Sequence, residues 1–548
     1  MEQGLRFDEA VEVVRASSLF TTHTPVPAGH DAFSEEMLRT YIAHYPDRMN
    51  TTWKTLMGLG KIDVHHPDEK FSMSFLAANL SLEVNGVSWL HGKVSREILA
   101  PLWPGYLAEE LHVSYVTNGV HYPTWTAAEW KAIYSQSCFE GIYQVEDGLV
   151  WDVRNKLRAK LIATIKEHIS GQSAPAHYSP RDIVAIRETL RDDILTIGFA
   201  RRFATYKRAH LLFKNLDRLS QIINNPQQPV QIVFAGKAHP ADKAGQDLIK
   251  RIVEVSRMPQ FLGKILFLEN YDMNLAKLMV QGVDIWMNTP TRPLEASGTS
   301  GEKAVMNGVM HFSVLDGWWV EGYQPNAGWA LPMERTYANQ EFQDEMDSET
   351  IYNMLEDQIA PLFYTFNQKG LPADWIQFIK NTIARVAVNF TTRRMLADYE
   401  QRFYTPLCRR HHDMIANDYE LAREMARWKK RISREWSNIE MIDFKRPDMV
   451  NQELLLGKKY EAEAVFHIGD LQPEDLGVEM VLAEEEKSGK FKIAAKVEFK
   501  LHDYNQSIAT YRCVLIPDSA GIFYVAGRMY AKNKKLAHRQ DFVLVKWL

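Results

Sequence analysis

Between residues 190 and 315 the chain alternates short apolar runs with amphipathic stretches. Five runs of four to seven residues are almost continuous in apolar side chains, namely 194–199, 230–235, 265–268, 283–287 and 309–315. Such runs are typical of strands buried on both faces of a sheet. Because a helical pattern separates each run from the next, the rhythm predicts an α/β fold with a doubly wound parallel sheet. Ligands bind beyond the carboxyl ends of such strands, so the loops after the five runs are the candidate binding loops.

The flanking regions have different periodicities. Residues 5–18 carry apolar positions at helical spacing and predict one amphipathic helix, which leads into the Pro-rich loop 21–27. Residues 351–440 are predicted to be mostly helical, with basic side chains such as Arg393 and Arg394 interpreted as solvated helix surface. Beyond about residue 445 the segments 491–499 and 521–526 alternate apolar and polar residues, which predicts antiparallel strands of a small C-terminal β-sandwich.

Composition narrows the class of protein. The chain has 548 residues, of which 46% are hydrophobic and 24% charged, so it is long enough for several globular domains. Its 64 basic and 69 acidic side chains give a net charge of -5, which provides no bulk attraction for nucleic acid or an anionic membrane. No apolar stretch reaches the length of a membrane span or a signal peptide. Cys138, Cys408 and Cys513 are far apart and odd in number, which favours free thiols and a cytoplasmic location.

The loop after the fourth apolar run combines glycines, hydroxyl residues and a lysine. It reads Glu295-Ala296-Ser297-Gly298-Thr299-Ser300-Gly301-Glu302-Lys303 and precedes a short helical segment. Free backbone N–H groups and a helix N-terminus favour a phosphate. The alternative is structural, since Thr299-Ser300-Gly301-Glu302 also fits a capping box that needs no ligand. Lys303 favours the functional interpretation, because the positive end of the helix dipole lowers a lysine pKa and makes it a candidate amine for a Schiff base.

The loop after the first apolar run is strongly basic. Arg201, Arg202, Lys207 and Arg208 lie within eight residues at the expected carboxyl end of a strand. Arginine supplies planar bidentate donors and lysine a point charge, so these residues could clamp oxyanions. A basic run is more often a solvated surface, but its position at the binding edge favours the anion site.

Other patterns carry less information. His65-His66 and Cys408 with His411-His412 contain metal-ligating residue types but lack a spaced partner pair, so no metal site is predicted. Trp318-Trp319 follows the last apolar run, where stacking on a sugar and core packing explain the two rings equally well.

Taken together, these residues resemble those of the α-glucan phosphorylases, the pyridoxal-phosphate enzymes that include glycogen, starch and maltodextrin phosphorylases. The signature is Glu295-Ala296-Ser297-Gly298-Thr299, followed by Lys303 and Asn307-Gly308. Further matching segments are Arg201-Arg202 with Tyr206-Lys207, Gly236-Lys237-Ala238, Glu269-Asn270-Tyr271, Asp316-Gly317 with Val320-Glu321, Asn85-Gly86-Val87, Thr117-Asn118-Gly119-Val120 and Thr22-His23-Thr24. The amino-acid sequences of residues 21–29 and 316–319 are most similar to those of the shorter bacterial and archaeal branch. The similarity to the family extends from residue 1 to about residue 430.

The resemblance implies a fold and a reaction. The expected fold is a two-lobed glycosyltransferase of the GT-B type, with residues 1–120 as the remainder of the N-terminal, glucan-binding lobe. Residues 121–440 would form the C-terminal catalytic lobe and 445–548 an accessory β-sandwich. The implied reaction is reversible, retaining phosphorolysis of a terminal α-1,4-linked glucose to glucose 1-phosphate. The partners are an α-1,4-glucan and inorganic phosphate, and the cofactor is pyridoxal 5'-phosphate, whose phosphate group acts with the substrate phosphate. Two phosphate groups require fixed cations rather than the carboxylate pair of glycoside hydrolases.

Site residues follow from the same resemblance. Lys303 would hold the cofactor as a Schiff base, with Thr299, Ser300 and Arg201 at the cofactor phosphate and Tyr271 beside the cofactor. Arg202 and Lys207 match the clamp for the substrate phosphate. Contacts to glucose hydroxyls are implied for Glu295, Ser297 and Gly298, and further sugar contacts for Asn118 and His23. The catalytic set is therefore Lys303, Arg202, Lys207 and His23, with no metal ligand.

The chain also departs from the family pattern. Ala204 stands where many members have a histidine beside the phosphate clamp, and Ser300 stands where the longer enzymes have a glycine. Nothing in residues 1–20 corresponds to the large N-terminal portion of the family, so the chain is expected to be a truncated phosphorylase, either as a homodimer or with a complementing N-terminal fragment. Two alternatives remain: a nucleotide-sugar enzyme of the glycogen synthase type, which commonly has a glutamate where Lys303 stands, and a non-catalytic glucan-binding fragment.

Overall fold

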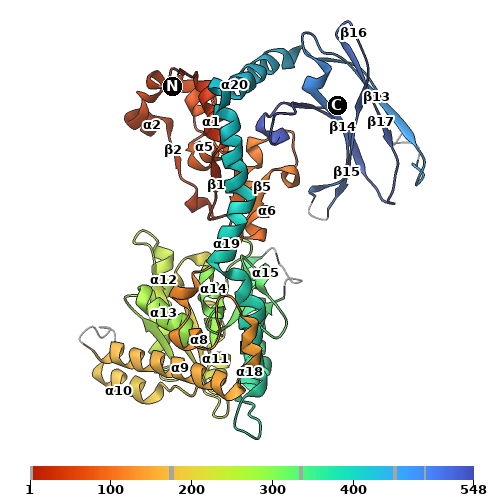
Figure 1. The fold of residues 1–548 in the computed structure, drawn as a ribbon. Coiled ribbons are helices and arrows are strands. Elements are labelled where there is room, and N and C mark those ends of the chain that lie inside the picture. The colour runs from red at the N-terminus through yellow and green to blue at the C-terminus, as the bar shows by residue number, and fades with distance from the viewer. Residues whose placement is uncertain (1–3, 172–177, 333–336, 338, 448–452, 487–488) are drawn as a thin grey trace.

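The computed structural model describes residues 4–171, 178–332, 337, 339–447, 453–486 and 489–548. The strands of these residues form two parallel sheets, two four-stranded antiparallel sheets and one short strand pair. Figure 1 shows the larger parallel sheet with its helices in the lower half of the molecule, and the smaller one together with the antiparallel strands in the upper half.

The larger sheet has six parallel strands in the order β11-β10-β9-β6-β7-β8. Their bounds are β6 Leu195–Arg202, β7 Val230–Lys237, β8 Ile265–Leu268, β9 Ile285–Asn288, β10 Met310–Val314 and β11 Gly328–Leu331. The five strands predicted from the apolar runs are confirmed. Along β7, Ile232 and Phe234 pack into one core while Val233 and Ala235 pack into another, so both faces are covered. This double burial is the reason that the runs are continuous rather than alternating.

Four helices, α7 to α10, precede this sheet in sequence, and α11 to α15 connect or follow its strands. Their bounds are α7 Tyr122–Trp125, α8 Ala128–Lys131, α9 Asp147–Ser170, α10 Pro180–Thr189, α11 Leu216–Ile223, α12 Lys243–Ser256, α13 Met273–Gly282, α14 Thr299–Val305 and α15 Trp319–Gly322. Helix α9 is fixed to the sheet by buried charges, since Arg158 Nη1 lies 2.7 Å from Asp284 Oδ1 immediately before β9. Asp284 also accepts from the backbone N–H of Thr196 at 3.0 Å, so the amino ends of β6 and β9 are anchored to α9.

The upper half contains the smaller sheet, in which β1 Leu19–Thr21, β4 Glu83–Gly86 and β5 Val113–Tyr115 are parallel in the order β1-β4-β5. The predicted N-terminal helix is confirmed as α1 Phe7–Ala16. Between β1 and β5 lie β2 Ala32–Phe33, α2 Glu35–Ile42, α3 Tyr45–Arg48, α4 Trp53–Met57, β3 Phe71–Ser72, α5 Met73–Asn79 and α6 Trp89–Leu99.

The helical region after β11 agrees with the prediction for residues 351–440. It comprises α16 Gln340–Met354, a π-helical turn Leu355–Ile359, α17 Ala360–Tyr364, α18 Ala373–Asn381, a second π-helical turn Thr382–Val386, α19 Thr392–Tyr399, a third Glu400–Tyr404 and α20 Thr405–Glu435. Within α20 the backbone of Asn417, Asp418 and Tyr419 is left-handed, which bends the helix. Beyond the bend α20 leads to the antiparallel strands.

The chain passes between the two halves twice, once between β5 and α8 and again at α19 (Figure 1). The two crossing segments bond to each other, since Val120 N donates to Phe390 O at 2.8 Å and Thr392 N donates to Val120 O at 2.9 Å. Gly119 is required by this close approach, because a Cβ there would lie 2.3 Å from Thr391 O.

The C-terminal region contains two antiparallel sheets, in the orders β12-β13-β17-β16 and β15-β14-β18-β19. The strands are β12 Glu440–Lys445, β13 Tyr460–His467, β14 Leu476–Glu485, β15 Phe491–Glu498, β16 Lys500–Asn505, β17 Ile508–Leu515, β18 Tyr524–Ala531 and β19 Val545–Trp547. One shared core includes Phe466 from the first sheet and Met480 from the second. The strand predicted at 491–499 is confirmed, whereas the one predicted at 521–526 begins at Tyr524.

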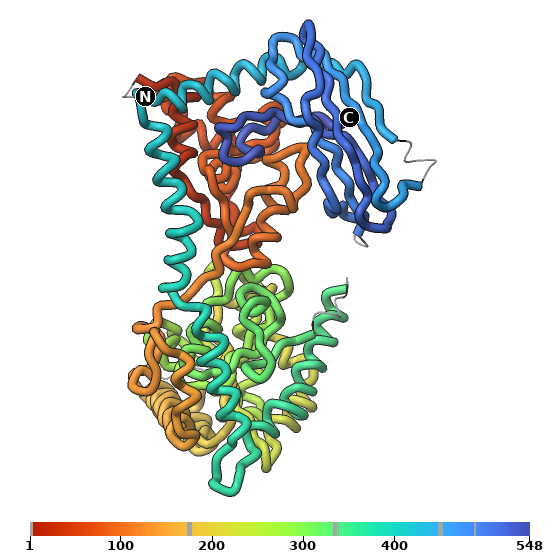
Figure 2. Tube along the Cα trace, turned by 45° about the vertical axis from the view of Figure 1, so that its right-hand side comes forward, coloured from red at the N-terminus to blue at the C-terminus, as the bar shows by residue number. Residues whose placement is uncertain are grey.

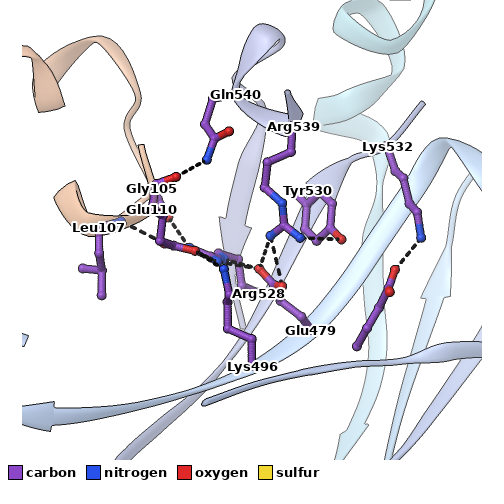
Figure 3. Close-up of polar contacts among 11 residues, drawn as sticks. Gly105, Leu107, Glu110, Glu479, Lys496, Arg528, Tyr530, Lys532, Arg539 and Gln540 are labelled. Carbon is purple, nitrogen blue, oxygen red and sulfur yellow. Dashed lines mark hydrogen bonds and ion pairs between the residues drawn. The ribbon is translucent and has the colours of Figure 1, made fainter. Parts of the chain in front are cut away.

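The antiparallel region lies against the smaller parallel sheet in both views (Figures 1 and 2). Arg528 of β18 is fully buried and donates to both oxygens of Glu110, at 2.7 and 2.6 Å. Its Nε also donates to Glu479 Oε1 at 2.9 Å. Arg539 approaches the same Glu479 carboxylate, and Gln540 Nε2 donates to Glu110 O (Figure 3). A buried ionic network thus joins segments more than 400 residues apart in sequence.

Candidate active site

Three loops meet at the carboxyl edge of the larger sheet. Glu295, after β9, accepts from Arg201 Nη2 at 2.9 Å and from Lys207 Nζ at 2.5 Å, and all three side chains are almost completely buried. Burial raises the pKa of Glu295, but the two cations outweigh this effect and hold it below its ordinary value. Burial and the neighbouring Arg201 lower the pKa of Lys207 to about 8, against the opposing effect of Glu295. The arrangement is a compact cationic site with one internal counter-ion.

Arg208 fixes these loops relative to each other. Its backbone is left-handed, with φ 49°, and its buried guanidinium donates to the carbonyls of Thr289 and Pro290 and to Asp344 Oδ1. The backbone N–H of Thr291 donates to Tyr206 O at 2.6 Å. The loop after β6 and the loop after β9 are therefore held as one unit, with α16 as a third support.

The loop after β10 completes this frame. Asp316 accepts from the backbone N–H of Glu295 at 2.9 Å and from that of Gly317 at 2.8 Å, while burial raises the pKa of its carboxyl to about 7. Gly317 has φ 54°, and a Cβ there would lie 2.2 Å from Ser297 O. The backbone of residues 295–298 is thus held in place by the loop after β10.

Lys303 projects from α14 towards the ring of Trp125, with Nζ 4.0 Å from the ring centroid. Burial lowers the pKa of Lys303, which increases the fraction of the neutral, nucleophilic amine. The sequence predicted a lowered pKa of Lys303 from the helix dipole, whereas in the structure the lowering comes from burial.

The capping-box alternative for residues 299–302 is wrong. The N-cap of α14 is Gly298, in a left-handed conformation with φ 92°, and no side chain caps the helix. Glu302 does not reach back to the backbone at the N-cap but is fully buried. Ser300 Oγ instead accepts a hydrogen bond from Trp286 Nε1 at 3.2 Å. The hydroxyl residues of the loop therefore have no role in capping α14.

Several buried polar atoms of this region lack a hydrogen-bond partner. They are Arg201 Nη1, Asn288 Oδ1 and Trp318 Nε1, and each belongs to a strand end or loop at the carboxyl edge of the sheet. Tyr271 lies near enough for the charge of Arg201 to act on it, although burial dominates and raises its pKa to about 12. Unsatisfied buried donors and acceptors are costly, so these three atoms are candidates for contact with a bound ligand.

The upper half contributes to the same region through α6 and the segment after β5. Ser88 Oγ donates to Ala296 O at 2.7 Å. Glu321 of α15 accepts from the backbone N–H of Trp89 at 2.8 Å and from the Thr117 hydroxyl at 2.7 Å. The loop after β9 is thus tied to the upper half beside Ser297.

Comparison with known proteins decides the family. The profile described as "Carbohydrate phosphorylase" matches residues 1–327. The chain belongs to this family. A second profile, "Glycogen phosphorylase C-terminal domain", matches residues 436–548. The resemblance predicted from the loop motifs is therefore confirmed.

Three relatives illustrate the extent of the similarity. The maltodextrin phosphorylase of Thermococcus litoralis is 35% identical over 100% of this chain and 65% of its own length. The glycogen phosphorylase of Mycobacterium tuberculosis is 34% identical over 88% of this chain and 57% of its own. The glycogen phosphorylase of Aquifex aeolicus is 39% identical over 74% of this chain and 60% of its own. The chain thus spans about 57 to 65% of the length of these relatives.

The structure brings together only part of the residue set expected for a carbohydrate phosphorylase. Arg201, Lys207 and Glu295 contact one another, and Thr299, Ser300 and Lys303 share α14. Ser297 and Gly298 lie in the loop immediately before that helix. The side chain of Arg202, at the end of β6 and next to Arg201 in sequence, is exposed. Asn118 is fixed through its backbone, which accepts from Arg394 Nη2 at 2.8 Å. His23 is exposed in the upper half, and within the described residues it forms no hydrogen bond or ion pair with the others.

Some residues around the candidate site were missed or misjudged in the sequence. Arg394 was interpreted as solvated, but it binds the carbonyls of Thr117 and Asn118. No local signal distinguishes it from Arg393. Trp125, which lies over Lys303, stands in no motif. The core-packing alternative for Trp318 and Trp319 is correct, since both are fully buried against aromatic neighbours.

The described part of this phosphorylase-family chain contains neither a cluster of metal-ligating side chains nor a helix that could span a membrane. No group of three or more His, Cys, Asp or Glu side chains is placed to hold a metal ion. Among the same residues, none of the helices combines the length and the apolar character needed to traverse a bilayer.

Proposed function

We propose that this chain carries the catalytic part of an α-glucan phosphorylase. The reaction is reversible phosphorolysis of a terminal α-1,4-linked glucose to glucose 1-phosphate, with glycogen or maltodextrin and inorganic phosphate as substrates. The observation that carries the proposal is the buried Arg201–Lys207–Glu295 cluster at the carboxyl edge of the sheet, in which Glu295 belongs to the loop that leads into α14 and Lys303. Fixed cations in a desolvated site are what a phosphate-dependent glycosyl transfer requires.

The residues present fit pyridoxal 5'-phosphate. Arg201 has a buried Nη1 without a partner, and Lys303 offers an amine with a lowered pKa. Lys303 would hold the cofactor covalently, Thr299, Ser300 and Arg201 would bind its phosphate, and Tyr271 would lie beside it. When bound, the cofactor supplies a phosphate group that can exchange a proton with the substrate phosphate.

The substrate side of the proposal rests on the remaining residues. Arg202 and Lys207 would bind the substrate phosphate, and Glu295, Ser297 and Gly298 would contact the glucose. Asn118 and His23 would contact sugar from the upper half. Because Glu295 already binds two cations, its carboxylate also keeps Arg201 and Lys207 in place before phosphate enters.

The finer description of the fold belongs to the same proposal. The described chain is mixed α/β with parallel and antiparallel sheets. We interpret it as a GT-B type arrangement, with residues 1–120 in one lobe, 121–440 in a doubly wound catalytic lobe and 445–548 in a β-sandwich. A cytoplasmic location, and assembly as a homodimer or with a complementing N-terminal fragment, complete the proposal.

The direct test is an assay of the purified chain loaded with pyridoxal phosphate. We expect glucose 1-phosphate to be released from maltodextrin only when inorganic phosphate is present. If the cofactor is retained without release, and a separately expressed N-terminal segment of a family member restores it, the chain is a complementing fragment. Transfer from a nucleotide sugar with no response to phosphate would contradict the proposal and favour a synthase-type enzyme.

Arg202→Ala tests the phosphate clamp. Hydrogen bonds between charged groups contribute about 1.5–3 kcal/mol, so the variant should bind inorganic phosphate roughly 10- to 100-fold more weakly. The measurement is calorimetric titration of the cofactor-loaded chain with phosphate. Arg251→Ala, on the exposed surface of α12, is the matched control. Equal phosphate affinity of the two variants would argue against the clamp.

A further inference from the structure

Glu302 carries a fully buried carboxyl group with a single long hydrogen bond. It lies on α14, one residue before Lys303, and its relative exposure is 0%. Its Oε1 is 3.5 Å from Ser297 Oγ, and its Oε2 has no hydrogen-bond partner. Among the described residues no cation comes within ion-pair distance of it. A charged carboxylate in this position would lack the pairing that buried charges normally have.

The surroundings favour the neutral form. Burial is the largest influence and raises the pKa of Glu302 to about 8. Arg394 from α19 and Lys303 from the same helix oppose this shift, and Glu321 from α15 adds to it. His311 of β10 borders Gly301, the residue before Glu302, but burial lowers its pKa to about 3, so it brings no charge. At neutral pH the Glu302 carboxyl is therefore mainly an O–H donor.

A neutral carboxyl group here has one acceptor to donate to. Ser297 is itself buried, and its backbone is fixed because Ser297 O accepts from Trp318 N at 2.9 Å. Only the hydroxyl of Ser297 can still rotate. A separation of 3.5 Å is long for an O–H···O bond, and such bonds often tighten when a site binds its ligand.

We propose that Glu302, in its protonated form, is a positioning residue that donates to Ser297 Oγ and so directs the Ser297 hydroxyl hydrogen towards a bound sugar. The inference rests on the proposed function, in which Ser297 contacts glucose. When the carboxyl loses its proton, the direction of the bond reverses, because a carboxylate can only accept. Ser297 then donates to Glu302 and is no longer a donor for the sugar.

The proposal predicts a pH dependence with a definite sign. Sugar affinity should be constant below the pKa of about 8 and should fall as pH rises through it. Stability should change in the same direction: a carboxyl with a higher pKa in the folded state than in the unfolded state binds its proton more tightly when folded. The folded state therefore loses stability as pH rises from the ordinary value of 4.5 towards 8.

The test uses three variants of the cofactor-loaded full chain, with calorimetric titration of glucose, an uncharged ligand, from pH 6.5 to 9. Glu302→Gln keeps a donor at every pH, so it should retain the affinity at neutral pH and lose this part of the pH dependence. Glu302→Met should bind glucose roughly fivefold more weakly at neutral pH. In a Ser297→Ala background, Glu302→Met should cause no further loss.

Two controls separate the carboxyl from its neighbours. Lys207 has a pKa of about 8 and titrates in the same range, and only the pH dependence that disappears in Glu302→Gln is assigned to Glu302. Thermal unfolding measures how much the buried Glu302 carboxyl group lowers the stability of the folded chain. Glu302→Met should raise Tm by about 2 °C or more, because it removes an unsatisfied buried oxygen. A more stable Glu302→Met variant with unchanged glucose affinity would overturn the positioning role.

Infrared spectroscopy tests the protonation state without a ligand. A protonated carboxyl band that is missing in Glu302→Gln should be present at neutral pH and vanish as pH passes about 8. If that band is missing at neutral pH, the inference is wrong even where glucose binds. If the band is present but the chain binds no glucose at any pH, the proposed function fails, and the role towards sugar fails with it.

Discussion

Arg528→Ala is expected to lower the free energy of unfolding by about 3–5 kcal/mol, the cost of removing one member of a buried ionic network. The Arg528 side chain is fully buried, and it pairs with the carboxylates of Glu110 and Glu479 together. Burial alone would raise the pKa of Glu110, but the hydrogen bonds from Arg528 and from the backbone of Leu107 keep it below its ordinary value. Without Arg528 both carboxylates remain buried with fewer cations.

The measurement is denaturant unfolding of the full chain, followed by intrinsic fluorescence. Arg539→Ala is the matched control: it also contacts Glu479, but its side chain is 32% exposed, so the loss should be smaller. Arg528→Met combined with Glu110→Gln and Glu479→Gln should recover much of the stability, because it removes the unpaired charges. If Arg528→Ala unfolds at the same denaturant concentration as the unaltered chain, the network contributes no stability.

Lys303→Ala is expected to abolish covalent retention of pyridoxal phosphate. Lys303 Nζ faces the Trp125 ring in a partly buried environment that lowers its pKa, and this favours the amine that a carbonyl compound needs. After reduction with borohydride, mass spectrometry of the unaltered chain should find a pyridoxyl group on Lys303. The alanine variant should carry none at this position.

Two control variants sharpen this experiment. Lys243→Ala removes a lysine whose side chain is 79% exposed and should leave the adduct on Lys303 unchanged. Lys303→Arg preserves a positive charge but no attachable amine, so it should also lose the adduct. An adduct spread over surface lysines, with none on Lys303, would contradict the cofactor assignment.

The sequence was most informative where apolar residues make up almost the whole of a strand. The five apolar runs became β6 to β10 because both faces of the sheet are covered, so that nearly every side chain had to be apolar. β11 has four residues, as β8 and β9 do, but it was missed because it begins at Gly328, which leaves an apolar run of only three residues. The smaller parallel sheet was also missed. Its strands have three or four residues, and Thr21 and Asn85 interrupt the apolar pattern, since their side chains hydrogen-bond to each other.

Within the site, the limit was contact between residues distant in sequence. The motif around Lys303 and the basic run at 201–208 could each be recognised locally. That Glu295 would bind Arg201 and Lys207 depends on two loops some 90 residues apart, which no spacing rule relates. The capping-box alternative assigned Glu302 to a helix cap because its spacing from Thr299 fits, yet tertiary packing places its Oε1 3.5 Å from Ser297 Oγ. Local propensity is overridden where the fold provides another environment.

The paired chain crossings near residues 119 and 391 have a mechanical consequence. Because the two segments lie side by side and bond to each other, the covalent connection between the halves is a single narrow strip. Such a strip resists separation but can twist and bend, which is the geometry of a hinge. In a rotation about such a hinge the displacement of each atom grows with its distance from the axis, so contacts between the halves far from Val120 would change more than those close to it. The backbone contact of Gly119 with Thr391 then sets the axis of that rotation.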